Sequence, residues 1–488
     1  MKRLLAFLLL ASVMQAPVHA ATPLAPLQAL AAHGARVSAL IVRLNDHKTL
    51  AAIQPDLALT PASTSKLYVA ASALQQWGPD YRFTTRLLGT GPVENGVLKG
   101  DLIFAGAGDP ALTTAQLFVL TRRLAERGIH RVTGHLIVDA SYFGHIACTA
   151  HDRCHALDDS HNAYNALLSS AAIDFATAQI SVIPAAVPGT SATVHLAPFD
   201  LPGVRIVNRV RTGPATSGWS IRVDRHTAHD RDTLTVSGTT PAGAMPHRFW
   251  RALSDPDRAA GAQLLALLAA AGIQVDGGAR VTYKSAPTGH VLAAIKGQAL
   301  ALQLSRMLIW SNNFMADTLA LDLLRTTQSP PLTLTAAGEL LTKRGRALEV
   351  ESGLWGKHTP GLELASGSGL TISNRASAHD MVALLATMYQ KPGLFPSFLG
   401  ALTVPAYTPV NLLKASQQPA WMHAIAAKTG SLNNPHSVFA LAGYARLADG
   451  HWGAFAVVIN GSKKYDVPLG MAIDATRKAL TPYLQNSH

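Results

Sequence analysis

The chain carries three short polar motifs, in the order Ser63-Thr64-Ser65-Lys66, Ser311-Asn312-Asn313 and Lys428-Thr429-Gly430. In the first motif, a serine precedes a lysine by three positions, which places both side chains on one face of a helix. A serine hydroxyl becomes an effective nucleophile when a neighbouring base takes its proton, and a lysine acts as that base where its site favours the neutral amine. The first motif therefore suits nucleophilic catalysis by Ser63, with Lys66 as the base, although taken alone most such matches are solvated helix starts.

The second and third motifs supply groups that bind a substrate and move a proton. The hydroxyl of Ser311 can relay a proton to a leaving amine, and the amide of Asn313 can bind a peptide group. Lys428 and Thr429 can hold a carboxylate, and glycine at position 430 lets a ligand backbone approach closely. Each tripeptide alone is typical of helix caps and strand ends, so the prediction depends on all three motifs occurring in this order.

Local patterns place the first motif at the start of a helix. Apolar residues recur with spacings of three and four from Leu67 to Trp77, and Pro61 stands just ahead of them. The segment before it predicts a helix and two strands joined by a turn, over Leu27–His33, Ser38–Leu44 and Leu50–Ile53.

From about Tyr81 the pattern changes to short strands separated by Gly and Pro. The predicted strands are 100–105, 134–139, 180–183, 204–210, 219–223 and 233–237. Helical patterns return at 259–271, 302–324, 332–344 and 377–389, and the second motif falls inside or at a break in the second of these. We therefore expect an α/β body, formed by residues 21–80 and 246–488, that is interrupted by a β-rich insert over residues 81–245.

The third motif lies on an expected edge strand that begins at Ala424. After it, two apolar strands flank Asp449-Gly450, which is a strong hairpin signal; they run over Val438–Ala445 and Trp452–Ile459. A final helix is predicted over 469–480. The motif and the last hairpin are therefore expected to belong to one antiparallel sheet.

The N-terminus has the pattern of a secretory signal peptide over residues 1–20, with Lys2 and Arg3 ahead of an apolar run and cleavage after Ala20. That run is shorter than the ~20 residues that span a bilayer, so we expect an exported, periplasmic protein without a transmembrane segment in its mature form. The net charge of +12 favours an anionic partner. Export and the scattered basic residues argue against nucleic acid, and favour a cell-wall polymer or a membrane surface.

Two cysteines, Cys148 and Cys154, lie among three histidines. A metal site is one interpretation, although zinc sites usually show tighter paired spacing. A local disulfide is favoured, because an exported protein meets an oxidising compartment.

The three motifs together resemble the active-site set of the serine enzymes that penicillin acylates. Among these enzymes, the chain resembles the DD-carboxypeptidase/DD-endopeptidase family typified by penicillin-binding protein 4 (peptidase family S13). The likeness covers nearly the whole mature chain and the interval of 248 positions between the first two motifs, and it includes Gly106–Pro110, Val138–Phe143, Gly367–Leu370 and Leu441–Tyr444. The resemblance implies a β-lactamase/transpeptidase-like domain, an antiparallel sheet with helices, that carries inserted domains.

The resemblance also implies a mechanism. Ser63 attacks the carbonyl between two D-alanines of a peptidoglycan stem peptide, and the backbone N–H groups of Ser63 and Ser431 form the oxyanion hole. Ser311 and Lys66 pass a proton to the departing amine, while Lys428 with Thr429 holds its carboxylate. Water then releases the acyl group, no metal or organic cofactor is required, and β-lactams acylate the same serine.

Several positions bear on specificity. Asp159 and Tyr164 are similar to acceptor-side pocket residues of the family, whereas Ser366 and Ile372 stand where relatives usually carry Asp and Arg. Two alternatives stay open: a serine β-lactamase, for which a Glu-x-x-Leu-Asn pattern is missing, and a non-catalytic protein that binds peptidoglycan through its positive surface.

Overall fold

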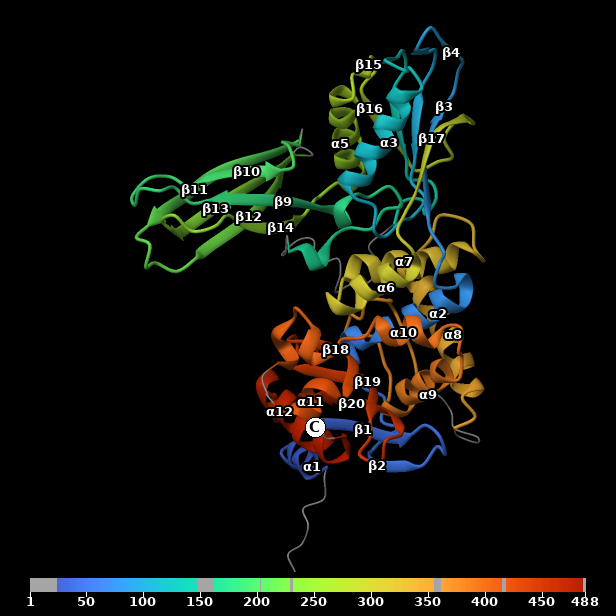
Figure 1. Cartoon of the computed structure of the whole chain (residues 1–488), viewed down its shortest axis with the longest axis vertical. Coiled ribbons are helices and arrows are strands. Elements are labelled where there is room, and N and C mark those ends of the chain that lie inside the picture. The colour runs from blue at the N-terminus through green and yellow to red at the C-terminus, as the bar shows by residue number, and fades with distance from the viewer. Residues whose placement is uncertain are drawn as a thin grey trace, which may run out of the picture.

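The computed structural model describes residues 24–146, 162–201, 203–228, 231–354, 361–414 and 418–485. Figure 1 shows three parts: a body that holds both ends of the described chain, an upper unit stacked on it, and a long arm that projects sideways from the upper unit. The predicted signal peptide, Cys148, Cys154 and Asp159 lie outside the described residues. Among the helices of the described ranges, none has the length and apolar character needed to cross a bilayer.

The body is built on a five-stranded antiparallel sheet in the order β18-β19-β20-β1-β2. Its strands are β1 (Arg36–Arg43), β2 (Thr49–Ile53), β18 (Ile425–Leu432), β19 (Val438–Arg446) and β20 (Trp452–Asn460). The strand that carries the third motif, β18, lies at the edge, as the sequence predicted. The central strands are apolar on both faces because helices cover both sides.

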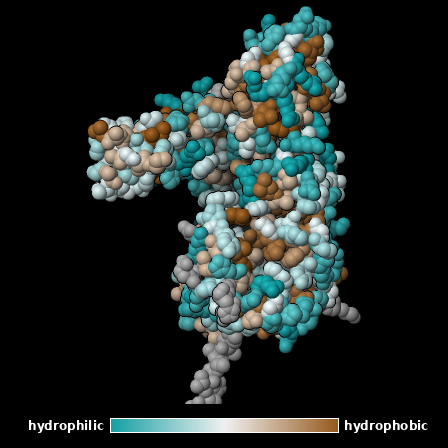
Figure 2. All heavy atoms as spheres, in the orientation of Figure 1, coloured by the Kyte–Doolittle hydropathy of each residue, from teal (hydrophilic) through white to brown (hydrophobic). Residues whose placement is uncertain are grey.

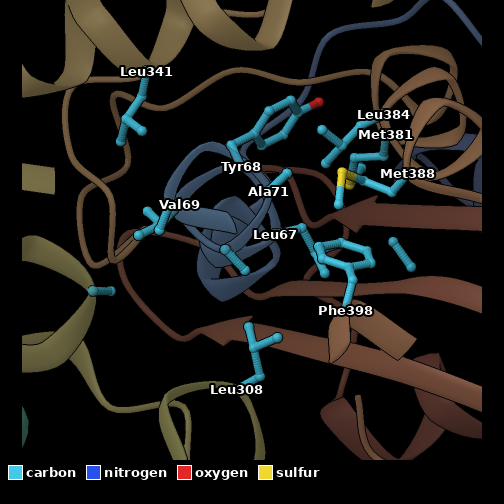
Figure 3. Close-up of a cluster of buried hydrophobic side chains, with 14 of the residues drawn as sticks. Leu67, Tyr68, Val69, Ala71, Leu308, Leu341, Met381, Leu384, Met388 and Phe398 are labelled. Carbon is cyan, nitrogen blue, oxygen red and sulfur yellow. The ribbon is translucent and has the colours of Figure 1, made fainter. Parts of the chain in front are cut away.

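One face of this sheet packs on α1 (Ala25–Ala32), α11 (Pro419–His423) and α12 (Leu469–Leu480). The other face packs on a larger helical layer, made of α2 (Lys66–Trp77), α6 (Leu300–Ile309), α7 (Asn313–Arg325), α8 (Leu334–Glu351), α9 (Ala378–Tyr389) and α10 (Phe395–Gly400). Helix α2 is buried on all sides from Lys66 to Leu74. Figure 3 shows its side chains Leu67 and Tyr68 among Met381, Leu384 and Phe398. The first motif is therefore anchored at the centre of the body.

The upper unit contains a five-stranded sheet, in the order β16-β8-β6-β3-β17, and a smaller four-stranded one, β15-β7-β5-β4. Helices α3 and α5 pack on it. Its elements are β3 (Thr84–Gly89), β4 (Val93–Glu94), β5 (Val97–Leu98), β6 (Leu102–Ala105), α3 (Thr114–Glu126), β7 (Arg131–Val132), β8 (Leu136–Asp139), α5 (Pro256–Ala270), β15 (Gln274–Val275), β16 (Ala279–Thr282) and β17 (His290–Lys296).

The arm consists of two three-stranded sheets around a small apolar core. The sheets are β10-β9-β14 and β11-β13-β12. Their strands are β9 (Thr177–Ile183), β10 (Thr193–Ala197), β11 (Val204–Gly213), β12 (Ser220–Ala228), β13 (Arg231–Pro241) and β14 (His247–Ala252). Because Thr177 of β9 pairs with Ala252 of β14, the chain enters and leaves the arm at one place.

Strand pairing places the end of the insert later than residue 245, the predicted boundary. Strand β16 extends the upper sheet beside β8, and β17 pairs with β3, so the upper unit includes the chain as far as Lys296. The predicted helix over 259–271 is present as α5, but it packs on the upper sheet rather than on the body. The body resumes at α6, and the insert is therefore one mixed unit plus one all-β arm.

Two helical features also differ from the prediction. Helix α3 falls in a region expected to be strands, although Thr113 and Gln116 form a capping box at its start and Leu117, Leu120 and Leu124 follow a helical spacing. The helix predicted over 302–324 is two helices, α6 and α7, with the second motif at the break.

Candidate active site

The first motif forms a tight turn that leads into α2. A short 3-10 helix spans Ala62–Ser65, and Ala62 adopts the left-handed conformation with φ of 47°. The hydroxyl of Thr64 donates to the carbonyl of Pro61 at 2.6 Å, which closes the turn. This turn holds Ser63 at the entrance of a buried helix, where Lys66 is the first residue.

The amine of Lys66 is fully buried and hydrogen-bonded. Its Nζ lies 2.9 Å from Ser63 Oγ, 2.8 Å from Asn313 Oδ1 and 2.5 Å from the carbonyl oxygen of Ser368. These three polar partners make the burial of the amine tolerable. The first two motifs therefore meet at this amine, as their chemistry required.

The second motif occupies the break between α6 and α7. Ser311 has a φ of 53°, a conformation that costs a non-glycine residue energy and is often retained at functional sites. Asn312 caps α7, because its Oδ1 accepts from the N–H of Met315 at 2.9 Å. Asn313 follows as the first residue of α7, and its Nδ2 donates to the carbonyl of Tyr164 at 3.1 Å. The break thus aims Ser311 and Asn313 at different lysines.

The third motif brings a second buried lysine. Lys428 Nζ lies 3.0 Å from Ser311 Oγ and 2.6 Å from the carbonyl oxygen of Thr429. Burial lowers the pKa of this amine to about 7. With a pKa near 7, both the charged and the neutral form of Lys428 are available near neutral pH.

Gly430 allows β18 to lie directly against the serine turn. A Cβ at this position would stand 2.7 Å from the carbonyl oxygen of Pro61 and 2.9 Å from the nitrogen of Ser63. No side chain fits there without moving one backbone away from the other. The next residue, Ser431, is exposed beside this contact.

The loop over residues 365–374 completes the site, and sequence reasoning did not identify its role. Its Ser368 supplies a carbonyl to Lys66, while the Ser368 N–H donates to Asp317 Oδ1 at 2.8 Å. The side chain of Asn374 accepts from two backbone N–H groups and donates to Ser65 Oγ and the Ser366 carbonyl. The Gly367–Leu370 motif marked the segment, but no sequence signal indicated Asn374 or Asp317.

The two departures from the family pattern occupy different environments. Ser366 is buried, and its Oγ accepts a hydrogen bond from the N–H of Gly369 at 3.3 Å. This bond stabilises the conformation of the loop. Ile372 is 36% exposed, and its carbonyl accepts from Arg375 at 2.5 Å.

The acceptor-side residues are only partly described. Tyr164 has an exposed side chain and contacts Asn313 through its carbonyl. Among the described residues, no cluster of three or more His, Cys, Asp or Glu side chains is placed to hold a metal ion. Ser63 is hydrogen-bonded to the buried Lys66, and a second pair, Ser311 and Lys428, lies in the same site. This arrangement is suited to acyl transfer.

Comparisons with known proteins agree with this geometry. The family described as D-Ala-D-Ala carboxypeptidase 3 (S13) matches residues 25–478. The D-alanyl-D-alanine carboxypeptidase of Actinomadura sp. (strain R39) is 29% identical over 452 residues, covering 87% of this chain and 77% of that protein. The D-alanyl-D-alanine carboxypeptidase DacB of Haemophilus influenzae is 26% identical over 443 residues, which cover 89% of this chain and 87% of that protein.

The fold is shared with a solved structure. The crystal structure of penicillin-binding protein 4 from Haemophilus influenzae matches with a TM-score of 0.73 at 22% identity, covering 92% of this chain and 97% of that one. A structure of the same protein in complex with a β-lactam gives a TM-score of 0.70 at 23% identity, with the same coverage. The predicted fold class, with its antiparallel sheet and helices, is confirmed.

Proposed function

Because the chain belongs to the D-Ala-D-Ala carboxypeptidase 3 (S13) family, a family of serine peptidases, we propose that it hydrolyses the D-Ala-D-Ala bond of peptidoglycan stem peptides through an acyl-enzyme on Ser63. The observation that carries this proposal is the 2.9 Å contact between Lys66 Nζ and Ser63 Oγ. It places a base within hydrogen-bond reach of the nucleophile.

In the acylation step, neutral Lys66 takes the proton of Ser63 as its Oγ attacks the carbonyl of the penultimate D-alanine. The N–H groups of Ser63 and Ser431 stabilise the oxyanion of the tetrahedral intermediate. The close approach of Gly430 to the nitrogen of Ser63 supports this assignment, since it brings the two backbone segments together.

Collapse of the intermediate requires a proton for the departing amine. The hydroxyl of Ser311 donates it and takes up the proton that Lys66 removed from Ser63, which leaves Lys66 neutral again. The 3.0 Å contact between Ser311 Oγ and Lys428 Nζ supports this role, because it holds the Ser311 hydroxyl in the site. Protonated Lys428 and the hydroxyl of Thr429 hold the carboxylate of the leaving D-alanine. Asn313 binds the amide of the substrate while fixing Lys66.

Water then attacks the acyl-enzyme, with Lys66 again as the base. A β-lactam acylates Ser63 in the same way. Cleavage of D-Ala-diamino-acid cross-links is a second reaction of the same chemistry, with Asp159 and Tyr164 on the acceptor side. The predicted signal peptide supports a periplasmic location for these reactions.

The test is to incubate the purified protein with a fluorescent penicillin and then with a muropeptide ending in D-Ala-D-Ala. We expect a durable adduct that is lost in Ser63→Ala, together with release of D-alanine by the wild type. Rapid turnover of penicillin would instead identify a β-lactamase, and the absence of any adduct would favour a non-catalytic binding protein.

A further inference from the structure

A cavity of about 350 Å³ lies at the junction between the upper unit and the arm. Its walls come from the start of α3, from β9 and β14, and from the segment that follows β10. Trp250 of β14 lines it and leaves 46% of its surface exposed to solvent. Figures 1 and 2 show that the arm projects sideways from the upper unit.

The cavity also contains a buried acceptor without a partner. Gln263 of α5 lines it and is only 4% exposed, and its Oε1 has no hydrogen-bond partner among the described residues. Leaving a buried acceptor unpaired is unfavourable. A bound ligand with an N–H or O–H group would satisfy this oxygen.

A second polar group, Asp174, lines the same cavity on a strained segment. Its carboxylate accepts from the backbone and the hydroxyl of Thr114. Asp174, Phe175 and Ala176 have φ values of 50°, 60° and 58°, so three successive non-glycine residues adopt the left-handed conformation. Such strain persists where the surrounding structure imposes it, and it is concentrated at binding and catalytic sites.

The charge of the lining identifies the kind of ligand. Of the described residues that line the cavity, none is Lys or Arg, although the chain carries a net charge of +12. Sites for anions use these two residue types, so this lining does not suit an anion. An exposed indole beside an amide oxygen and a carboxylate suits a sugar, whose C–H face packs on the ring and whose hydroxyl and amide hydrogens are donated to the oxygens.

The cavity is connected to the active site through one segment, residues 162–176. Asn162 pairs with Arg251, the neighbour of Trp250, and Tyr164 accepts from Asn313. At the other end of the segment, the ring of Phe175 lies 6.3 Å from that of Phe314, which follows Asn313. A polymer held in the cavity is therefore bound next to the segment that fixes a partner of the catalytic lysine.

We propose that this cavity binds the neutral glycan strand of peptidoglycan, with an N-acetylated sugar packed on Trp250 and hydrogen-bonded to Gln263 and Asp174. The inference rests on the proposed function, because the glycan is the polymer that carries the stem peptide. Binding of the strand would hold the enzyme on its substrate between cleavage events.

The test uses the full chain and a β-1,4-linked tetramer of N-acetylglucosamine, which contains no peptide. Isothermal titration should show saturable binding that does not weaken with added salt, because no charge is neutralised. Trp250→Ala should bind about tenfold more weakly, given the strength of stacking on aromatic rings. The matched control Tyr407→Ala removes an aromatic side chain that is 78% exposed on the body, and should bind as the wild type does.

A second variant separates binding from folding. Gln263→Leu removes the unpaired oxygen, so its melting temperature should be unchanged or higher while its affinity for the tetramer falls. No saturable binding by the wild type, equal affinity in Trp250→Ala, or binding that disappears with salt would overturn the proposal. Release of D-alanine from a sugar-free peptide by the wild type tests the proposed function separately, since neither assay depends on the other.

Discussion

At the scale of single residues, the site depends on two buried lysines that have different partners. Lys66 Nζ contacts the oxygens of Ser63, Asn313 and Ser368, whereas Lys428 Nζ contacts one hydroxyl and one carbonyl oxygen. The difference suits their proposed roles: Lys66 accepts a proton from Ser63, and Lys428 binds the carboxylate of a substrate.

The lowered pKa of Lys428 predicts a pH dependence. In the free protein burial brings this pKa to about 7, and the amine binds a substrate carboxylate only when protonated. The kcat/KM for a D-Ala-D-Ala peptide should therefore fall as pH rises through about 7, since this parameter reports the free enzyme. In Lys428→Arg the guanidinium stays charged, so this decline should vanish from the pH–rate profile, even if the absolute rate is lower. A decline at the same pH in both proteins would contradict the assignment.

The contact of Gly430 with the serine turn predicts a large effect from one methyl group. In Gly430→Ala the Cβ would meet the carbonyl of Pro61 and the nitrogen of Ser63. A displacement of the order of 1 Å at a reacting centre costs about 100-fold in rate, so acylation by a fluorescent penicillin should slow by about that factor. Gly470→Ala is the control, because a Cβ there meets no atom within 4 Å. Equal rates in the two variants would exclude the close contact as a requirement.

At the scale of elements, the junction between the insert and the body contains two buried carboxyl groups. Asp109 lies just after β6 and Asp322 on α7, and within the described part of the chain the two oxygens of Asp322 have no hydrogen-bond partner. Gly108, with φ of 71°, passes so close that a Cβ there would lie 2.3 Å from Asp322 Oδ1. Burial raises the pKa of Asp109 to about 6 and that of Asp322 well above its usual value.

These raised pKa values predict that stability decreases as pH rises. A carboxyl group that is held protonated in the folded state stabilises it at low pH. This contribution is lost from about pH 4 upward, and the loss is complete above about pH 6 for Asp109 and continues to higher pH for Asp322. Asp322→Asn should therefore raise the free energy of unfolding at pH 7.5 by ~1–3 kcal/mol, measured by denaturant titration. Asp80→Asn, at an exposed position, is the control. A less stable Asp322→Asn variant would contradict the assignment.

Local sequence patterns predicted most elements of the body, because helices α8, α9 and α12 and the last hairpin have regular apolar spacing. The insert was predicted less well. Strand β17 pairs with β3 about 200 residues earlier in the chain, and no local pattern records such a partner. For the same reason the carbonyl of Ser368 and the side chain of Asn374 were missed at the site: one is a backbone group and the other a common residue in a loop. The roles given to the motif residues stay predictions.

At the scale of the whole molecule, the arm is attached through two paired strands, β9 and β14. A truncated protein that lacks most of the arm can therefore be designed. We expect that replacing Ile180–Phe249 with an Asn-Gly turn joins paired strands without disturbing the body, because Gln179 and Trp250 face each other in the register. The shortened protein should still form the penicillin adduct. It should bind the sugar tetramer more weakly, because the cavity loses the wall formed by the segment after β10. Labelling on a gel and titration measure the two properties. A folded variant that fails to label would show that the arm supports the catalytic site.

The central sheet also determines when the protein becomes active. Strand β1, from the start of the described chain, pairs with β20 along its whole length, and β20 ends only at Asn460. This long-range pairing delays completion of the body until the C-terminal segment has been made, whereas the upper unit and the arm draw their strands from the middle of the chain. Ser63 and Lys428 therefore meet late in folding. Under the proposed chemistry, the rate at which penicillin labelling appears during refolding reports the completion of this sheet. A chain that ends before β18 should not be labelled by penicillin.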